Sequence, residues 1–272
     1  IRHKKSKSYL TILQLMNINI TFAHLCKSYN QPMQPVAATS KYSVKYFPDA
    51  VLRWEKEGNY FYFHTRDTIL EIWVISDKVV RFRYAAEGKF QRDFSYAVAQ
   101  PVTASIISFD VQEEEDSFKI ITSQVNVLIT KDNLRITITD KENNIINQDE
   151  AGFHWQYYLQ KGGKIVYCSK LIQDDECFYG LGDKASDLNL HGKRLENYGA
   201  DQYGYGTDTD PLYKNIPFYY GLHHDKAYGI FFDNTFRTLF DFGLERKEVC
   251  SFWARGGEMC YYFICGPQLL EV

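Results

Sequence analysis

The sequence predicts an all-β protein whose fold class is an antiparallel β-sandwich. After residue 45, no long stretch shows the periodicity of an amphipathic helix. Short runs rich in Val, Ile, Tyr and Phe recur instead, separated by turn-forming Asn, Asp and Gly residues. Aromatic residues make up 16% of the chain, which suits a large sandwich core because aromatic side chains favour strands.

The N-terminal 45 residues are predicted to lie outside the sandwich. Residues 1–26 combine a basic start with a mixed apolar stretch, as a secretory leader does, although Gln and Asn residues make this stretch a poor membrane span. Residues 27–45 are polar, contain two prolines and indicate a linker. The chain starts with Ile rather than Met and so looks clipped. We expect an exported, periplasmic or surface-anchored protein if the leader is real, and a cytoplasmic one otherwise.

Residues 46–272 are predicted to form the sandwich domain, and several strands can be placed in it. In "VVRFRY", residues 79–84, apolar residues alternate with two arginines, which gives the strand one apolar face and one charged face. Residues 117–149 are broken by "KDN" and "KENN" and predict a meander. Residues 217–242 predict two strands joined by "HHDK", and residues 248–265 predict a hairpin across "RGG".

Composition and motifs argue against several classes of function. The formal charge of −3 gives no basic surface for nucleic acid. The six cysteines include no C-x-x-C pair, so a zinc site is not expected. Free buried thiols are expected, although a Cys250–Cys260 bridge is conceivable in an exported protein. The "GLG" at 180–182 lacks the spacing of a dinucleotide fingerprint, and neither a cofactor nor a metal is expected.

Residues 180–216 do not fit a simple strand pattern. The stretch is long, glycine-rich and acidic, and loops of this length in compact domains are usually functional. Its acids are Asp183, Asp187, Glu196, Asp201, Asp208 and Asp210. Retaining glycosidases need two carboxyls about 5–5.5 Å apart, which proximity within a loop does not establish. Asp208 and Asp210 offer oxygen ligands but do not match the twelve-residue calcium loop.

Three blocks of sequence occur in order around this loop. They are "FYGLGDK" at 178–184, "DPLYKNIPF" at 210–218 and "YGIFFDN" at 228–234. This arrangement resembles the N-terminal β-sandwich of glycoside hydrolase family 31, the α-glucosidase family. That family carries F-Y-G-L-G-E-K, then an acid-bearing loop, then D-P-L-Y-K-S-I-P-F and Y-G-I-F-F-D-N. The ending "YYFICGPQLLEV" also looks like the family's exit from this sandwich.

The resemblance implies a galactose mutarotase-like sandwich in front of an eight-stranded β/α barrel, and that catalytic barrel is absent from this chain. The family's two catalytic aspartates lie on the barrel, so no catalytic residue is expected here and the chain alone should be inactive. The full-length parent is expected to hydrolyse α-glycosidic bonds with retention through a covalent intermediate. Its expected partners are an α-linked oligosaccharide and the missing barrel, which should dock on an exposed apolar face.

The resemblance also implies one substrate-binding residue, Asp201. In family members an Asp from a loop of this sandwich contacts the non-reducing sugar, and Asp201 holds that position before the D-P-L-Y block. A carboxylate suits the task because it accepts charge-assisted hydrogen bonds from hydroxyls. The alternative is a turn acid that binds nearby backbone N–H groups. Asp183 replaces the family's usual Glu, and Tyr198 stands where Trp-Asn is common, so glucose, xylose and galactose all remain open.

Two other interpretations are kept. A stand-alone carbohydrate-binding module would need its own concave aromatic platform and measurable affinity for sugars. A mutarotase-like aldose epimerase would need a histidine and a carboxylate that converge in a sheet cleft. His64 and His154 are the histidines in the strand regions that are available for that role.

Overall fold

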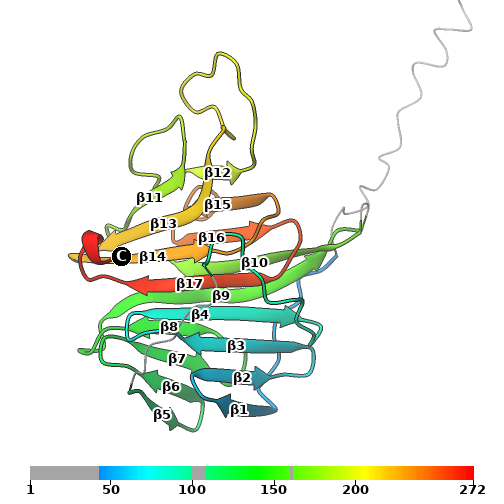
Figure 1. Cartoon of the computed structure of the whole chain (residues 1–272), viewed down its shortest axis with the longest axis vertical. Helices are drawn as coiled ribbons and strands as arrows, with labels where there is room; N and C mark the ends of the chain where they lie inside the picture. Colours follow the sequence, from blue (N-terminus) through cyan, green and yellow to red (C-terminus); the bar gives the residue numbers. More distant parts are fainter. Residues whose placement is uncertain (1–42, 100–107, 160–161) are drawn as a thin grey trace, which may run out of the picture. The chain divides into compact units, whose positions relative to one another are not determined.

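The computed structural model describes residues 43–99, 108–159 and 162–272, and it confirms the antiparallel β-sandwich. The predicted leader, residues 1–26, and most of the predicted linker lie outside the described residues. Over the described ranges, the strands form one eight-stranded and one nine-stranded sheet (Figure 1). The one helical element in these ranges is a 3-10 turn, η1 (Leu269–Glu271).

The order of strands in each sheet departs from the order in sequence. The eight-stranded sheet runs β1 (Arg53–Glu57), β2 (Tyr60–His64), β3 (Thr68–Val74), β4 (Val79–Ala86), β17 (Met259–Cys265), β14 (Lys226–Phe232), β13 (Asn215–His223) and β11 (Cys177–Gly182). The nine-stranded sheet runs β12 (Arg194–Asn197), β15 (Thr238–Phe242), β16 (Val249–Ala254), β10 (Lys164–Leu171), β9 (Ile145–Tyr157), β8 (Ile136–Thr139), β7 (Asn126–Thr130), β6 (Ser117–Ile121) and β5 (Asp110–Glu113). β6 to β9 are the meander predicted over residues 117–149, which is confirmed.

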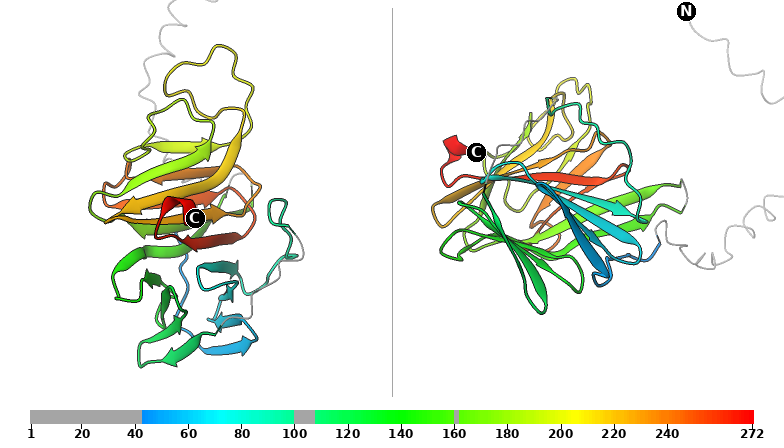
Figure 2. Two further views of the ribbon diagram at one scale, coloured as in Figure 1. Left: turned by 60° about the vertical axis from the view of Figure 1, so that its left-hand side comes forward. Right: turned by 60° about the horizontal axis from the view of Figure 1, so that its bottom comes forward.

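The two sheets face each other and share one hydrophobic core (Figure 2). In β4, Val80, Phe82 and Tyr84 are buried in this core, as the predicted alternation requires. Tyr84 stacks on Phe153 of β9, in the opposite sheet, with ring centroids 4.5 Å apart. Contacts of this kind between the layers explain the high aromatic content, because large rings fill the space between two sheets.

One ion pair lies inside this core. The Lys170 Nζ atom donates to Oδ1 of Asp149 at 2.6 Å and to the hydroxyl of Tyr261 at 3.0 Å. The other carboxylate oxygen of Asp149 accepts the backbone N–H of Ile136 at 2.8 Å. Burial opposes the charge on Lys170, but the Asp149 carboxylate raises the pKa of this lysine above its usual range. Lys170 and Tyr261 belong to opposite sheets, so the pair links the two layers.

The two predicted hairpins have different outcomes. β13 and β14 pair as predicted, with His223 opposite Lys226 across a two-residue turn. The hairpin predicted over residues 248–265 is wrong. β16 pairs with β10 and β15, whereas β17 pairs with β4 and β14, so the two strands lie in opposite sheets. The short glycine-containing link between them therefore crosses from one layer to the other.

The run predicted over residues 217–242 also divides between the layers. β14 ends at Phe232 in the eight-stranded sheet, and β15 begins at Thr238 in the nine-stranded sheet. Between them, the side-chain amide of Asn234 donates to the backbone oxygens of Gly256 at 2.9 Å and Glu258 at 3.0 Å. The two crossings are thus bonded to each other. Alternation predicts which face of a strand is buried but not which sheet the strand joins, and this explains both corrections.

The described cysteines carry no disulfide bond: Cys168, Cys177, Cys250, Cys260 and Cys265 are free. The bridge conceivable between Cys250 and Cys260 is not formed, because these residues lie on strands of opposite sheets. Cys26 lies outside the described residues. Burial raises the pKa of the Cys260 thiol to about 12, so this thiol stays protonated and packs as a small apolar group.

Two glycines let β11 bend over β13. Gly180 has φ of 126° and Gly182 has φ of 82°, values that other residues rarely adopt. A Cβ atom on Gly180 would lie 2.6 Å from the backbone oxygen of Phe218. We expect Gly180→Ala to lower the free energy of unfolding by about 2 kcal/mol. Gly206→Ala is the control, because nothing lies within 4 Å of that position. Urea denaturation of both variants measures the effect, and equal stabilities would contradict this role of Gly180.

Candidate functional site

The predicted loop over residues 180–216 is only partly irregular. β11 extends to Gly182, and β12 forms a short edge strand paired with β15. Two irregular segments remain, residues 183–193 and residues 198–214. The second joins β12 to β13 and is called the Asp201 loop below. It projects beyond the ends of the strands that it connects (Figure 1). Because β12 and β13 belong to different sheets, the loop is held at its base by both layers.

A buried lysine fixes the base of the Asp201 loop. The Lys184 Nζ atom donates to Oδ1 of Asp210 at 2.9 Å, and the lysine side chain is 4% exposed. The other carboxylate oxygen of Asp210 accepts the backbone N–H of Glu196. Burial lowers the pKa of Lys184 and raises the pKa of Asp210, so each charge depends on its contact with the other.

Asp201 itself is exposed, and no hydrogen bond or ion pair joins it to the described part of the chain. Tyrosines surround it along the loop. Tyr203 is fully exposed, and Tyr205 meets Tyr213 edge-on with ring centroids 6.3 Å apart. The Tyr213 hydroxyl donates to the backbone oxygen of Gln202. The loop therefore presents a carboxylate that can accept hydrogen bonds from outside, one residue before Gln202, whose backbone oxygen binds Tyr213.

Other acids of this region have cationic partners. The pairs are Glu196 with Arg237, Asp208 with Lys193, Asp187 with Lys193, and Asp210 with Lys184. Asp208 and Asp210 thus face different lysines rather than a common centre. Within the described ranges, no group of three or more His, Cys, Asp or Glu side chains is arranged to hold a metal ion.

A hollow of about 450 Å³ opens at the base of the Asp201 loop, between Tyr198, Pro217 and Phe231. Asn197, the last residue of β12, lines this hollow and is 6% exposed. Neither its amide nitrogen nor its amide oxygen has a hydrogen-bond partner in the described chain. Buried amides are normally paired, so Asn197 is an exception among the described residues. Sequence analysis missed Asn197, because no local pattern separates a buried amide from an exposed one.

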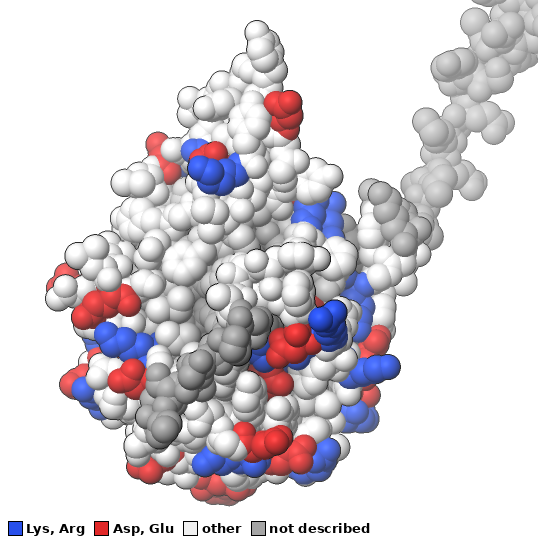
Figure 3. Space-filling view, in the orientation of Figure 1, with Lys and Arg blue, Asp and Glu red and all other residues white. Residues whose placement is uncertain are grey.

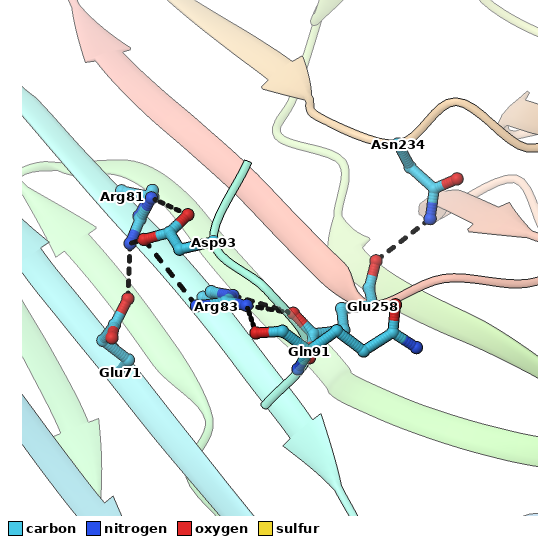
Figure 4. Close-up of polar contacts among 7 residues, drawn as sticks. All are labelled: Glu71, Arg81, Arg83, Gln91, Asp93, Asn234 and Glu258. Atoms are coloured by element: carbon cyan, nitrogen blue, oxygen red, sulfur yellow. Dashed lines mark hydrogen bonds and ion pairs between the residues drawn. The ribbon is translucent and has the colours of Figure 1, made fainter. Parts of the chain in front are cut away.

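The arginines of β4 lie next to this hollow, on the outer face of the eight-stranded sheet. Arg81 contacts Glu71 at 2.5 Å and Asp93 at 2.8 Å, and Arg83 contacts Glu258 at 2.7 Å (Figure 4). Both arginines are buried, because the segment that carries Asp93 lies across the sheet. Their charges are matched by these acids, so the cluster is a structural network and not an open anion site.

Over β13, β14 and β17, this outer face is mainly uncharged. Phe218 of β13 lies opposite Phe231 of β14, which in turn lies opposite Tyr262 of β17. Ile216, at the start of β13, and Tyr213, just before it, are exposed. Figure 3 shows few charged side chains over much of the upper part of the molecule. Contiguous apolar surface of this kind is typical of sites where other proteins or domains dock.

The histidines do not form one cleft. His64 lies on β2, where its Nε2 atom is 2.8 Å from Oε1 of Glu55. His154 lies in the other sheet, and burial lowers its pKa to about 4. His223, at the end of β13, is buried, with Nε2 2.8 Å from the backbone oxygen of Ile146. Its neighbour His224 lies beyond the end of β13, in the turn, and is exposed.

Comparison with known proteins agrees with this architecture. The chain is 29% identical over 214 residues to α-glucosidase 2 of Bacillus thermoamyloliquefaciens, which covers 78% of this chain and 26% of that protein. It is 32% identical over 114 residues to an α-glucosidase of Saccharolobus solfataricus, which covers 42% of this chain and 16% of that protein. The chain thus spans about a quarter or less of the length of these curated relatives.

Solved structures show the same relationship. A glycoside hydrolase family 31 dextranase of Flavobacterium johnsoniae complexed with isomaltotriose superposes with a TM-score of 0.72 at 32% identity. That match covers 81% of this chain and 27% of the dextranase chain. In the described residues we find no helix of the length and apolar character that a membrane span requires. Residues 69–241 match the family described as the glycosyl hydrolase 31 N-terminal galactose mutarotase-like domain, and this chain belongs to that family.

Proposed function

We propose that this chain is the N-terminal domain of a retaining α-glycosidase and that its Asp201 loop reaches into the substrate pocket of a catalytic barrel. The barrel would be supplied by polypeptide beyond this chain. Membership of the family and the relatives named α-glucosidase support this proposal. An α-xylosidase from Lactiplantibacillus pentosus is 35% identical to this chain over 98 residues. An α-xyloside is therefore the second candidate substrate, after an α-glucoside.

The observation that carries the proposal is the free Asp201 carboxylate on a loop with a fixed base. Sugar hydroxyls donate hydrogen bonds to carboxylates, and such bonds are stronger when the acceptor is charged. A catalytic contact also needs a defined position, which the buried Lys184–Asp210 pair gives to the loop. The other acids of this region that form ion pairs already use their carboxylates within the protein, so they are less available to a substrate.

The uncharged outer face of the eight-stranded sheet is the proposed docking surface for the barrel. The side chain of Val272 lies against this sheet, since a Cβ atom on Gly229 of β14 would be 2.6 Å from its Cγ1 atom. Polypeptide that followed Val272 would therefore start beside the apolar face.

The test uses the full-length parent with Asp201→Asn. Removing one charge-assisted hydrogen bond, worth about 1.5–3 kcal/mol, should lower kcat/KM for isomaltose and for an aryl α-glucoside by roughly 10- to 100-fold. Asp187→Asn is the matched control. Asp187 is also an exposed acid, but it lies outside the Asp201 loop and pairs with Lys193 at 3.6 Å. The present chain alone should turn over neither substrate.

Two results would count against the proposal. If Asp201→Asn and Asp187→Asn have the same kcat/KM as the wild-type parent, the loop does not contact the substrate. If the wild-type parent hydrolyses no α-glycoside, the assignment to an α-glycosidase is wrong.

A further inference from the structure

The outer face of the nine-stranded sheet carries a groove of about 580 Å³. It runs over β9, β10, β16 and β15, on the side away from the sandwich core. None of the residues of the Asp201 loop lines it. A volume of this size is within the range of small-molecule sites, which are typically several hundred cubic ångströms.

The floor of the groove is a row of residues that are cross-strand partners. Leu239 lies opposite Trp253, Trp253 opposite Tyr167, and Tyr167 opposite His154. The Tyr167 ring stacks on Trp253 with centroids 5.8 Å apart and on His154 with centroids 5.0 Å apart. Phe47 continues the stack beyond His154 at 5.1 Å. Side chains stand perpendicular to a sheet, so this row presents the edges of aligned rings toward the groove.

A second row of residues beside the aromatic one is polar. Asp241, Ser251 and Ser169 are cross-strand partners, and all three line the groove. Arg194 binds the Asp241 carboxylate, with its Nε atom at 2.8 Å from Oδ2, while its guanidinium lies 5.6 Å from the centroid of the Trp253 ring. Asp241 and Ser169 are buried and already bonded within the protein, so the half-buried Ser251 and the arginine are the polar groups of this row that a ligand can reach.

The charged residues that line the groove are four cations, Lys45, Arg194, Arg246 and Arg255, and three acids, Glu150, Asp241 and Glu245, an excess of one positive charge. Arg246 pairs with Glu150 at 2.9 Å, and Arg194 pairs with Asp241 and Glu245. A polyanion such as nucleic acid requires a basic surface whose charges are free to meet phosphates. A neutral ligand with many hydroxyl groups is the better match, because each hydroxyl can both donate to a carboxylate and accept from an arginine.

We propose that this groove binds a neutral oligosaccharide, as a second glycan site separate from the Asp201 loop. The choice of an α-linked glucan as the ligand rests on the proposed function. The presence of the groove and its lining residues does not depend on that function. Such a site would hold a polymeric substrate near the enzyme without taking part in the chemistry.

The test is affinity electrophoresis of this chain in gels that contain dextran or soluble starch, together with calorimetry using isomaltotriose. We expect retardation of the wild-type chain in at least one gel. Trp253→Ala should weaken the binding more than tenfold, because truncation of a central aromatic anchor has large effects. Arg246→Ala is a second variant at an exposed position that should weaken binding about threefold and preserve the fold.

Two controls separate this site from other surfaces. Asp201→Asn and Phe236→Ala, which alters an exposed residue outside the groove, should bind the glucans as the wild type does. Absence of retardation in both gels would overturn the inference. So would loss of binding in Asp201→Asn with retention in Arg246→Ala and Trp253→Ala, since the glucan would then lie at the loop. The proposed function has a separate readout, which is turnover by the full-length parent.

Discussion

Lys170→Met is expected to lower the free energy of unfolding by about 3–5 kcal/mol. The variant would leave the Asp149 carboxylate, whose side chain is 0% exposed, without its cation inside the core. The hydroxyl of Tyr261 would lose the same partner. A buried charge without a partner is costly because the surrounding side chains cannot replace water. Urea denaturation at pH 7 measures the difference, and a stability equal to that of the wild type would contradict the role of the pair.

A double variant separates the loss of the pair from the loss of packing. Lys170→Met combined with Asp149→Asn removes both charges and keeps an acceptor for the backbone N–H of Ile136. We expect it to be more stable than Lys170→Met alone, because replacing a whole buried ion pair is often nearly neutral. Lys193→Met, at a surface pair with Asp208, should leave the stability close to that of the wild type, because exposed ion pairs contribute little.

Glu176 is expected to make the protein less stable as the pH rises from about 4.5 to 7. The Tyr228 hydroxyl donates to Oε1 at 2.6 Å, and the Gln173 backbone N–H donates to Oε2 at 2.8 Å. Burial nevertheless raises the pKa of Glu176 to about 7, because the side chain is almost fully removed from water. The protonated form is therefore favoured in the folded protein.

The sign of this effect follows from the two states. In the unfolded chain Glu176 ionises near its ordinary pKa of about 4.3, whereas in the folded protein it stays protonated up to about 7. Its contribution is fully present below the unfolded pKa and is lost on the way to neutral pH, by on the order of 3 kcal/mol.

Glu176→Gln isolates this contribution, because glutamine imitates the protonated side chain at every pH. The stability of the wild type relative to the variant should fall between pH 4.5 and pH 7.5 and stay constant above that range. Thermal or urea unfolding at several pH values provides the comparison. A difference between the two proteins that does not change with pH would show that Glu176 ionises normally in the folded state.

The strands were largely predictable from sequence, and their partners only where the chain turns locally. The meander over residues 117–149 and the β13–β14 hairpin follow from turn residues that lie between alternating runs. The pairing of β16 with β10 joins residues such as Ser251 and Ser169, far apart in sequence, and alternation carries no signal for such a pair. β12 was missed because "RLEN" is short and polar at both ends.

Some residues of the candidate site could be predicted from the sequence, and others became visible only in the structure. Asp201 was located by resemblance to a family, and the structure places it on an exposed loop. Sequence gave no sign that Asn197 would be buried without a hydrogen-bond partner. The aligned rings of Trp253, Tyr167 and His154 come from three separate strands, so their row exists only after the sheet has formed.

The chain passes between the layers at residues 233–237 and again at residues 255–258, and Asn234 ties the two passages together. The two passages therefore connect the sheets at one place, and hydrogen bonds join them to each other. A protease cut in one of them would leave the layers joined by the other. The two sheets also share one hydrophobic core, so we expect both to gain and lose their amide-exchange protection together.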